Sequence, residues 1–533
     1  MTAAEEILAT LMRPVDEALP RDALRRITAR EARILVEDAA LGRSWVLDGA
    51  TLDLRRLAEG GVAGRGAGTF LLGNARLPVS LAVEAKGEPA VIGFRAALSE
   101  TRPAALAALA PALAPLRALD APATLELSGR LDADGALATL ETRLTARGGA
   151  LDLGEGRRVP IAALDLRGAL RGDALAVERA TLRLDGAGAP TLTGRATARR
   201  GDAGWEGRAE LALDAAPIAG LARWWPEGLG GNERAWITQN ITAGTARQGQ
   251  WTFAATAPAD LSSVTLTAVE GALQVEDATV HWLRPIPPVE GVRGTVAFAR
   301  DSVTARVAAA RQSGTQVQAR EAEIRIGFPD GAVPTAEIQL PLAGPLPDVL
   351  ALLQHPRLRL FERRPLPLKE PAGALDGRLA LSFPLLNDLP VEQLRVRAQA
   401  RLGNVRLADV VLGRPIERGQ FDLTVDNDGL RLAGTATFAE IALRLGVEMD
   451  FRAGPPTQVT MRETVQARAE ARQLAALDLA HEVCARVPAS GRRRQPNVYA
   501  PRPYAASSAV TASRSARSAS GPPCHAIRPF SIA

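Results

Sequence analysis

Apolar and polar side chains alternate residue by residue over much of this chain, and this pattern limits the folds that it can adopt. In segment 394–402, Leu, Val, Ala, Ala and Leu alternate with Arg, Arg, Gln and Arg. In segment 443–452, Leu, Leu, Val, Met and Phe alternate with Arg, Gly, Glu, Asp and Arg. Successive side chains of a β-strand point to opposite faces of the sheet, so each segment predicts a strand with one apolar and one wet face.

Turn sequences separate the alternating segments. They lie at residues 132–135, 185–186, 330–331 and 426–429, and each contains Asp followed by Gly. Asp, Asn and Gly tolerate the left-handed backbone that tight hairpins require, and a unit of strand, hairpin and strand recurs. We therefore predict a mostly β fold: an elongated antiparallel meander of repeated hairpins that forms a curved, groove-like sheet, with a few short surface helices.

The domain organisation follows from where the alternation is interrupted. We predict an N-terminal helix in residues 1–22, a β region at 23–215 with a helix at 103–119, and a second β region at 246–460 with a helix at 346–354. Between the β regions lies a Trp- and Pro-containing insertion, 216–245, with helices at 216–225 and 232–240. A helical stretch at 461–482 follows, and Pro347, Asp348 and Pro356 mark the ends of the helix at 346–354.

The last segment, 483–533, differs in composition from the rest. It contains eight arginines, both cysteines and both tyrosines, but no Asp or Glu. The first 482 residues hold 56 basic and 59 acidic residues, so the basic pI belongs to this tail and the body has no electrostatic signal for nucleic acid. Two interpretations stand: a natural disordered tail, or translation in another reading frame.

Residues that carry chemistry are sparse. The three histidines of the first 482 residues, His281, His355 and His481, are far apart in sequence, and no second metal ligand stands at a useful spacing. We expect no catalytic residue, metal or cofactor, and hence no enzyme. Trp224 and Trp225 raise the alternative of a sugar-stacking platform, but anchoring in a core is favoured, and we predict that Trp225 and Trp236 are largely buried.

The stretch RWWPEGLGGNERAWITQNITAGTARQGQW resembles the central-region signature of YhdP-type proteins, which are AsmA-like and TamB-like periplasmic proteins. The matching positions are Trp225, Pro226, Arg234, Trp236, Ile237 and Gly244. GALQVEDATVHWLRPIPPVEGVRGTVAF, PLPDVLALLQHPRLRLF and GALDGRLALSFPLLNDLPVEQLRVRAQARLGNV resemble further segments of this family, as does RITAREARILVEDAALGRSWVLDGATLDLRR. The resemblance covers roughly residues 25–479.

The resemblance implies a bridge-like lipid-transfer protein, in which a curved sheet encloses an apolar groove between the inner and outer membranes. The partners that it implies are phospholipid acyl chains, the two membranes and periplasmic or outer-membrane proteins. Alternation along the strands provides candidate lining residues for the groove: Leu211, Leu213, Leu394, Val396, Leu443, Leu445 and Val447. The same alternation also describes a closed β-sandwich. Two other functions stay open, a scaffold for outer-membrane biogenesis and a glycan-binding or glycan-cleaving protein.

Location is the point on which the sequence and the resemblance disagree. The N-terminus lacks the basic region of a signal peptide, and the longest apolar run, 103–116, is too short and too rich in proline to span a bilayer. Such a chain is expected to be cytoplasmic or a non-functional fragment as written. The resemblance implies a periplasmic protein that is anchored in the inner membrane.

Overall fold

The structure is a computed structural model. It describes residues 24–38, 43–72, 75–86, 91–107, 116–132, 136–154, 156–225, 231–260, 262–329, 331–358, 368–386, 393–411, 414–452, 458–470 and 507–517, together with the single residues 12, 227, 390, 454 and 473. The chain divides into two compact units: residues 1–278 with 297–300, and residues 279–296 with 301–533. Each unit is described by itself.

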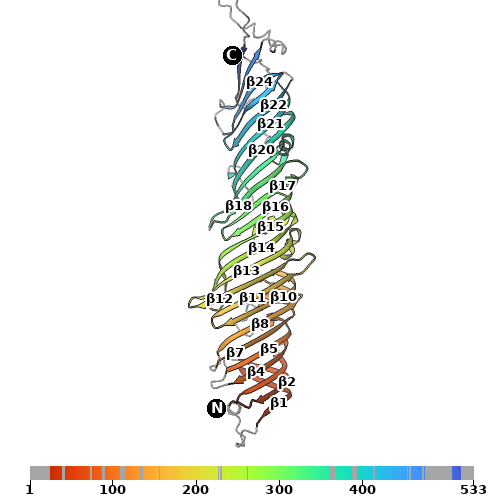
Figure 1. Cartoon of the computed structure of the whole chain (residues 1–533), viewed down its shortest axis with the longest axis vertical. Coiled ribbons are helices and arrows are strands. Elements are labelled where there is room, and N and C mark those ends of the chain that lie inside the picture. The colour runs from red at the N-terminus through yellow and green to blue at the C-terminus, as the bar shows by residue number, and fades with distance from the viewer. Residues whose placement is uncertain are drawn as a thin grey trace, which may run out of the picture. The chain divides into compact units, whose positions relative to one another are not determined.

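Unit 1 is an antiparallel ladder in which most strands pair with their neighbours in the chain (Figure 1). In ladder order the strands are β1 (Arg26–Asp38), β2 (Arg43–Arg56), β3 (Val62–Leu72), β4 (Ala75–Lys86), β5 (Val91–Thr101), β7 (Ala123–Leu131), β8 (Leu137–Arg147), β10 (Arg158–Arg171), β11 (Ala174–Leu184), β12 (Thr191–Gly201), β13 (Gly204–Pro217) and β14 (Ile241–Ala257).

Short elements lie beside one end of this ladder. Strands β6 (Leu119–Asp120) and β9 (Ala150–Asp152) pair with each other, and β9 also pairs with the start of β10. The helices are α2 (Pro103–Leu106), η3 (Ile218–Gly220), α3 (Leu221–Trp224) and α4 (Gly231–Asn240). Strand β15 (Thr265–Val280) follows β14 in the chain and lies in unit 1 up to residue 278, whereas residues 289–296 of β16 (Val289–Ala299) lie in unit 2.

Unit 2 has the same architecture, and Figure 1 shows its strands β20, β21, β22 and β24 in this order along the ladder. Each strand pairs antiparallel with the next. The order is β17 (Ser302–Gln312), β18 (Gln318–Gly327), β19 (Thr335–Pro345), β20 (Lys369–Pro384), β21 (Arg395–Val411), β22 (Arg414–Asp426), β23 (Gly429–Phe438), β24 (Ile441–Asp450), β25 (Val459–Glu470) and β26 (Ser507–Arg517). Helix α5 (Leu346–Leu353) and η4 (Pro356–Leu358) connect β19 to β20.

The predicted fold class is confirmed: the structure is mostly β, antiparallel and built of successive hairpins, with few short helices. Helix α5 lies within the predicted range 346–354, and α4 begins one residue before the predicted range 232–240. The insertion helix predicted at 216–225 is reduced to η3 and α3, because β13 continues to Pro217. The helix predicted at 103–119 is α2 at its start, but residues 119–120 form a strand. The predicted N-terminal helix lies outside the described residues apart from residue 12.

Two predictions near the C-terminus are wrong where the structure describes the chain. The helix predicted at 461–482 is strand β25 over residues 461–470, because Val465 and Ala467 pair with Leu445 and Leu443 of β24. This pairing outweighs the helical preference of a segment rich in Ala, Arg and Glu. Within the tail predicted to be unpacked, residues 507–517 form β26 and pair with β25. The rest of the tail lies outside the described residues.

Fully buried apolar side chains gather where helices and short strands lie against the ladders. In unit 1 the cluster includes Ile161, Leu184 and Trp224. In unit 2, Leu346 of α5 packs with Val405 and Phe421, and a neighbouring cluster holds Val317, Val349 and Leu375. We call this end of each ladder the helix-bearing rim, and the opposite strand ends the open rim.

Candidate functional site

One face of the unit 2 ladder is apolar across successive strands. Residues that pair directly across an antiparallel ladder project to the same side of the sheet. One such row runs from β20 to β24 and contains Leu379, Ala398, Val425, Leu430 and Met449. The next row contains Ala400, Leu423, Leu432 and Val447. We call this surface, and its counterpart in unit 1, the apolar face.

The apolar face of unit 1 is built in the same way. A row from β5 to β14 contains Leu98, Leu125, Leu144, Leu166, Ala180, Gly194, Leu211 and Trp251, each directly across from the next. The register therefore converts the alternation of single strands into a continuous surface, because a shift by one residue would move the apolar side chains to the other face.

The opposite face of both ladders carries cross-strand ion pairs. Arg195 faces Glu210 with 2.6 Å between their charged atoms, and Arg431 faces Glu448 at 3.3 Å. These side chains are half or more exposed, so each pair contributes little to stability. The ion pairs matter for which face can bind a ligand. The charged face stays in contact with water, so an apolar ligand can bind only on the opposite face.

The described residues cover only part of the apolar face. In unit 2, α5 buries Leu346 and Val349 against the helix-bearing rim, and Asp348 in its first turn accepts a hydrogen bond of 2.8 Å from the Gln316 backbone N–H. Farther along the strands, Leu379, Val396, Leu423 and Val447 are only half-buried. Within the described residues, the main contacts of each strand are with its ladder neighbours and these short elements. A second sheet would be required for a β-sandwich.

Aromatic side chains on the apolar face lie over glycines. A Cβ on Gly271 would stand 2.1 Å from Cδ1 of Trp251, and one on Gly249 would stand 2.4 Å from Cη2 of the same ring. Likewise, a Cβ on Gly419 would meet the Phe421 ring at 2.5 Å. Each ring thus occupies the space that a side chain at these glycines would fill: the Trp251 ring lies over Gly249 of its own strand and Gly271 of β15, and the Phe421 ring lies over Gly419 of its own strand.

The predicted lining residues fall into two groups. Leu211, Leu213, Val396 and Val447 are half-buried on the apolar face, and Leu394, just before β21, is also half-buried. Leu443, in contrast, is 7% exposed and belongs to a core cluster, and Leu445 packs against two such clusters. The sequence pattern cannot separate these groups, because it gives the face of a residue but not what covers that face.

The family-motif residues hold the insertion together. Arg234 of α4 donates hydrogen bonds to the carbonyl oxygens of Trp225 (2.5 Å) and Ala222 (3.3 Å) and so ties α4 to α3. Gly244 has a φ of +111°, and a Cβ there would stand 2.6 Å from Cα of Ala278, so the close approach requires glycine. Ile237 is half-buried, and Pro226 lies outside the described residues.

The prediction that Trp236 is buried is wrong, because 48% of its surface is exposed. Trp225 is half-buried. The buried anchor is Trp224, which is 8% exposed and whose Nε1–H donates to the carbonyl oxygen of Asp185 at 3.0 Å. The helix direction decides this, since α3 ends at Trp224 and Trp225 leaves it with extended backbone. Adjacent tryptophans gave no sequence signal to choose between them.

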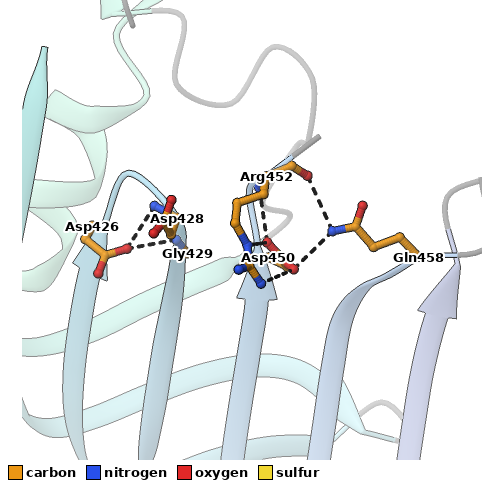
Figure 2. Close-up of polar contacts among 6 residues, drawn as sticks. All are labelled: Asp426, Asp428, Gly429, Asp450, Arg452 and Gln458. Carbon is orange, nitrogen blue, oxygen red and sulfur yellow. Dashed lines mark hydrogen bonds and ion pairs between the residues drawn. The ribbon is translucent and has the colours of Figure 1, made fainter. Parts of the chain in front are cut away.

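At the open rim of unit 2, polar side chains form hydrogen bonds in the turns that follow the strand ends (Figure 2). Asp426 accepts hydrogen bonds from the backbone N–H groups of Asp428 and Gly429 at 2.9 and 3.0 Å. Beside it, Asp450 accepts bonds of 2.9 Å from two nitrogens of the Arg452 guanidinium. The bonds from Arg452 hold the pKa of the Asp450 carboxyl well below its usual range. These hydrogen bonds stabilise the turns, which is the role that the contacts of Asp426 and Asp450 support.

The described residues contain no group of three or more His, Cys, Asp or Glu side chains that could hold a metal ion. In the same part of the chain, no helix combines the length and the apolar character needed to cross a membrane. What the described residues do share is the extended apolar face. Binding along the apolar face is the arrangement that the side chains support.

These features define the class: an antiparallel β-ladder protein with one charged face and one partly uncovered apolar face. The model of the YhdP protein family matches residues 117–481, more than half of the chain, and the chain belongs to this family. This confirms the resemblance drawn from the sequence. No curated protein and no solved structure matches the chain.

Proposed function

We propose that the apolar face of each unit binds the acyl chains of phospholipids. In this proposal the protein is a non-enzymatic conduit that carries phospholipids through the periplasm between the inner and outer membranes and maintains outer-membrane lipid composition. The partners are the two membranes and the lipids themselves. Membership of the YhdP family supports an association with lipid transport.

One observation carries the proposal: the rows of Leu, Val and Ala beyond the helix-bearing rim are only half-buried. Without a ligand, these rows would add up to an exposed apolar surface larger than soluble monomers usually tolerate. A scaffold that only spaces its partners has no use for such a surface. Acyl chains would cover it and would leave the charged face in water.

The test is lipid content. The purified full chain should carry phospholipid, which is measured by solvent extraction and mass spectrometry. Leu423→Asp places a carboxylate on the apolar face and should lower this load. Thr424→Asp is the matched control, because Thr424 is the next residue of β22, is exposed and lies on the charged face. It should leave the lipid load unchanged.

Two outcomes contradict the proposal. A folded wild-type chain that carries no phospholipid and takes none up from vesicles would exclude a conduit and favour a scaffold for outer-membrane biogenesis. Equal lipid loads in Leu423→Asp, Thr424→Asp and wild type would place the lipid somewhere other than the apolar face. Circular dichroism of each variant shows whether the fold is retained.

A further inference from the structure

The helix-bearing rim carries helices and β-bulges with polar side chains. Glu100, Glu321, Asn404 and Arg418 have positive φ values of 51–54°, and each lies at a register shift between paired strands. All four are exposed. A bulge bends its strand and increases the local twist. This rim therefore presents polar side chains to water on its outer side and packed helices on its inner side.

At the open rim the apolar face continues to the strand ends. Leu175 pairs across from Leu170, and Phe451 stands two residues beyond Met449 on the same side of the chain. The five side chains that extend the face in this way are between 37% and 43% exposed. We call them the apolar lip: Leu137, Leu175, Leu385, Phe451 and Val459.

Exposed apolar side chains near the helix-bearing rim are placed differently. Leu153 lies in the turn between β9 and β10, and Trp236 lies on α4. Trp282 lies in the loop after β15, where its Nε1–H donates to Gln312 at 3.2 Å. None of the three lies in a strand of the ladders. Among the described residues of the apolar lip, in contrast, Leu137, Leu175 and Val459 lie in ladder strands, and Leu385 and Phe451 directly follow the ends of β20 and β24.

We infer that the apolar lip is the entrance of the conduit: acyl chains enter and leave sideways over the open rim, and the headgroup stays outside it. This inference rests on the proposed function. A lipid that crosses this rim passes from one apolar contact to the next, and its chains never meet water. Crossing the helix-bearing rim would require displacing α5, whose Leu346 and Val349 are buried.

The experiment measures the rate of lipid uptake by the full chain. The probe is a fluorescent phospholipid in vesicles of phosphatidylethanolamine and phosphatidylglycerol. Leu137→Gln and Leu175→Gln should each slow uptake by about fourfold, the effect of losing roughly one apolar contact in the entry step. Leu153→Gln is the matched control, since Leu153 is 42% exposed in the same unit but at the other rim. Its uptake rate should equal that of wild type.

The inference and the proposed function fail in different ways. If the wild-type chain takes up no lipid, the proposed function fails. If wild type takes up lipid and all three variants are slowed equally, or none is slowed, entry over the open rim is excluded. Equilibrium lipid load is measured on the same samples. It should stay at the wild-type level in each variant, because the lip changes the entry step and not the bound state; a fall in load that matches the fall in rate would reassign these residues to the binding surface.

Discussion

Phe421 and Leu423 lie on the same face of β22, two residues apart, yet Phe421 is 7% exposed under α5 whereas Leu423 is half-buried. The boundary between packed core and uncovered apolar face therefore falls within a single strand. On the core side, apolar contacts hold α5 on the sheet. On the other side, the same kind of residue is left for a ligand.

This boundary predicts opposite outcomes for two aspartate substitutions. Leu445→Asp places a charge beside two core clusters and should lower the free energy of unfolding by on the order of 3–4 kcal/mol. Val396→Asp should cost less than about 1 kcal/mol, because a carboxylate on the uncovered face reaches water. Urea unfolding monitored by circular dichroism measures both. Equal, large losses would indicate a closed β-sandwich.

The insertion should depend on Trp224 and not on Trp236. Trp224→Ala removes a buried ring and its hydrogen bond to Asp185, which should cost about 3–5 kcal/mol. Trp236→Ala should cost clearly less, about 1 kcal/mol or below, since about half of the residue is exposed. Thermal unfolding distinguishes the two variants. A larger loss for Trp236→Ala would contradict the packing described here.

The glycine under Trp251 should not tolerate a side chain. Gly271→Ala forces the ring or the neighbouring backbone to move, because the new Cβ would stand 2.1 Å from Cδ1 of Trp251, and should cost about 1–3 kcal/mol. Gly446→Ala is the control: its nearest neighbour would be 3.8 Å away. Because alanine has less conformational freedom than glycine in the unfolded chain, Gly446→Ala should raise the free energy of unfolding by up to about 1 kcal/mol. Chemical denaturation compares the two, and a destabilised control would refute the argument.

The pair at the open rim predicts an acid-dependent contribution. The pKa of Asp450 is lowered in the folded protein by Arg452, so the pair stabilises the fold above the unfolded value of about 3.9 and this contribution is lost as the pH falls below it. Asp450→Asn should therefore lower the melting temperature slightly at neutral pH, and this difference should shrink steadily as the pH falls below about 3.9 toward the lower pKa of the folded state. Asp422→Asn, whose partner Arg401 is 3.9 Å away with both side chains exposed, should match wild type throughout. A difference that does not shrink on acidification would show that Asp450 acts through something other than its charge.

The sequence is sufficient to predict most of the strands, their two faces and the family. Period-two alternation assigns a face to residues such as Leu423 and Thr424 from local geometry alone, and the turn at 426–429 follows from the backbone preferences of Asp, Asn and Gly. These features depend on neighbours in the chain. They are visible without knowing what lies across the sheet.

Which apolar residues are covered depends on tertiary contacts and could not be predicted from the sequence. Leu443 and Val396 have the same alternating pattern, but only Leu443 lies within a packed cluster at the helix-bearing rim. The same holds for Trp224 against Trp236, and for β25, whose pairing with β24 outweighs a helical composition. Burial depends on contacts between residues that are far apart in the chain, and the sequence around a residue does not show which distant residues will contact it.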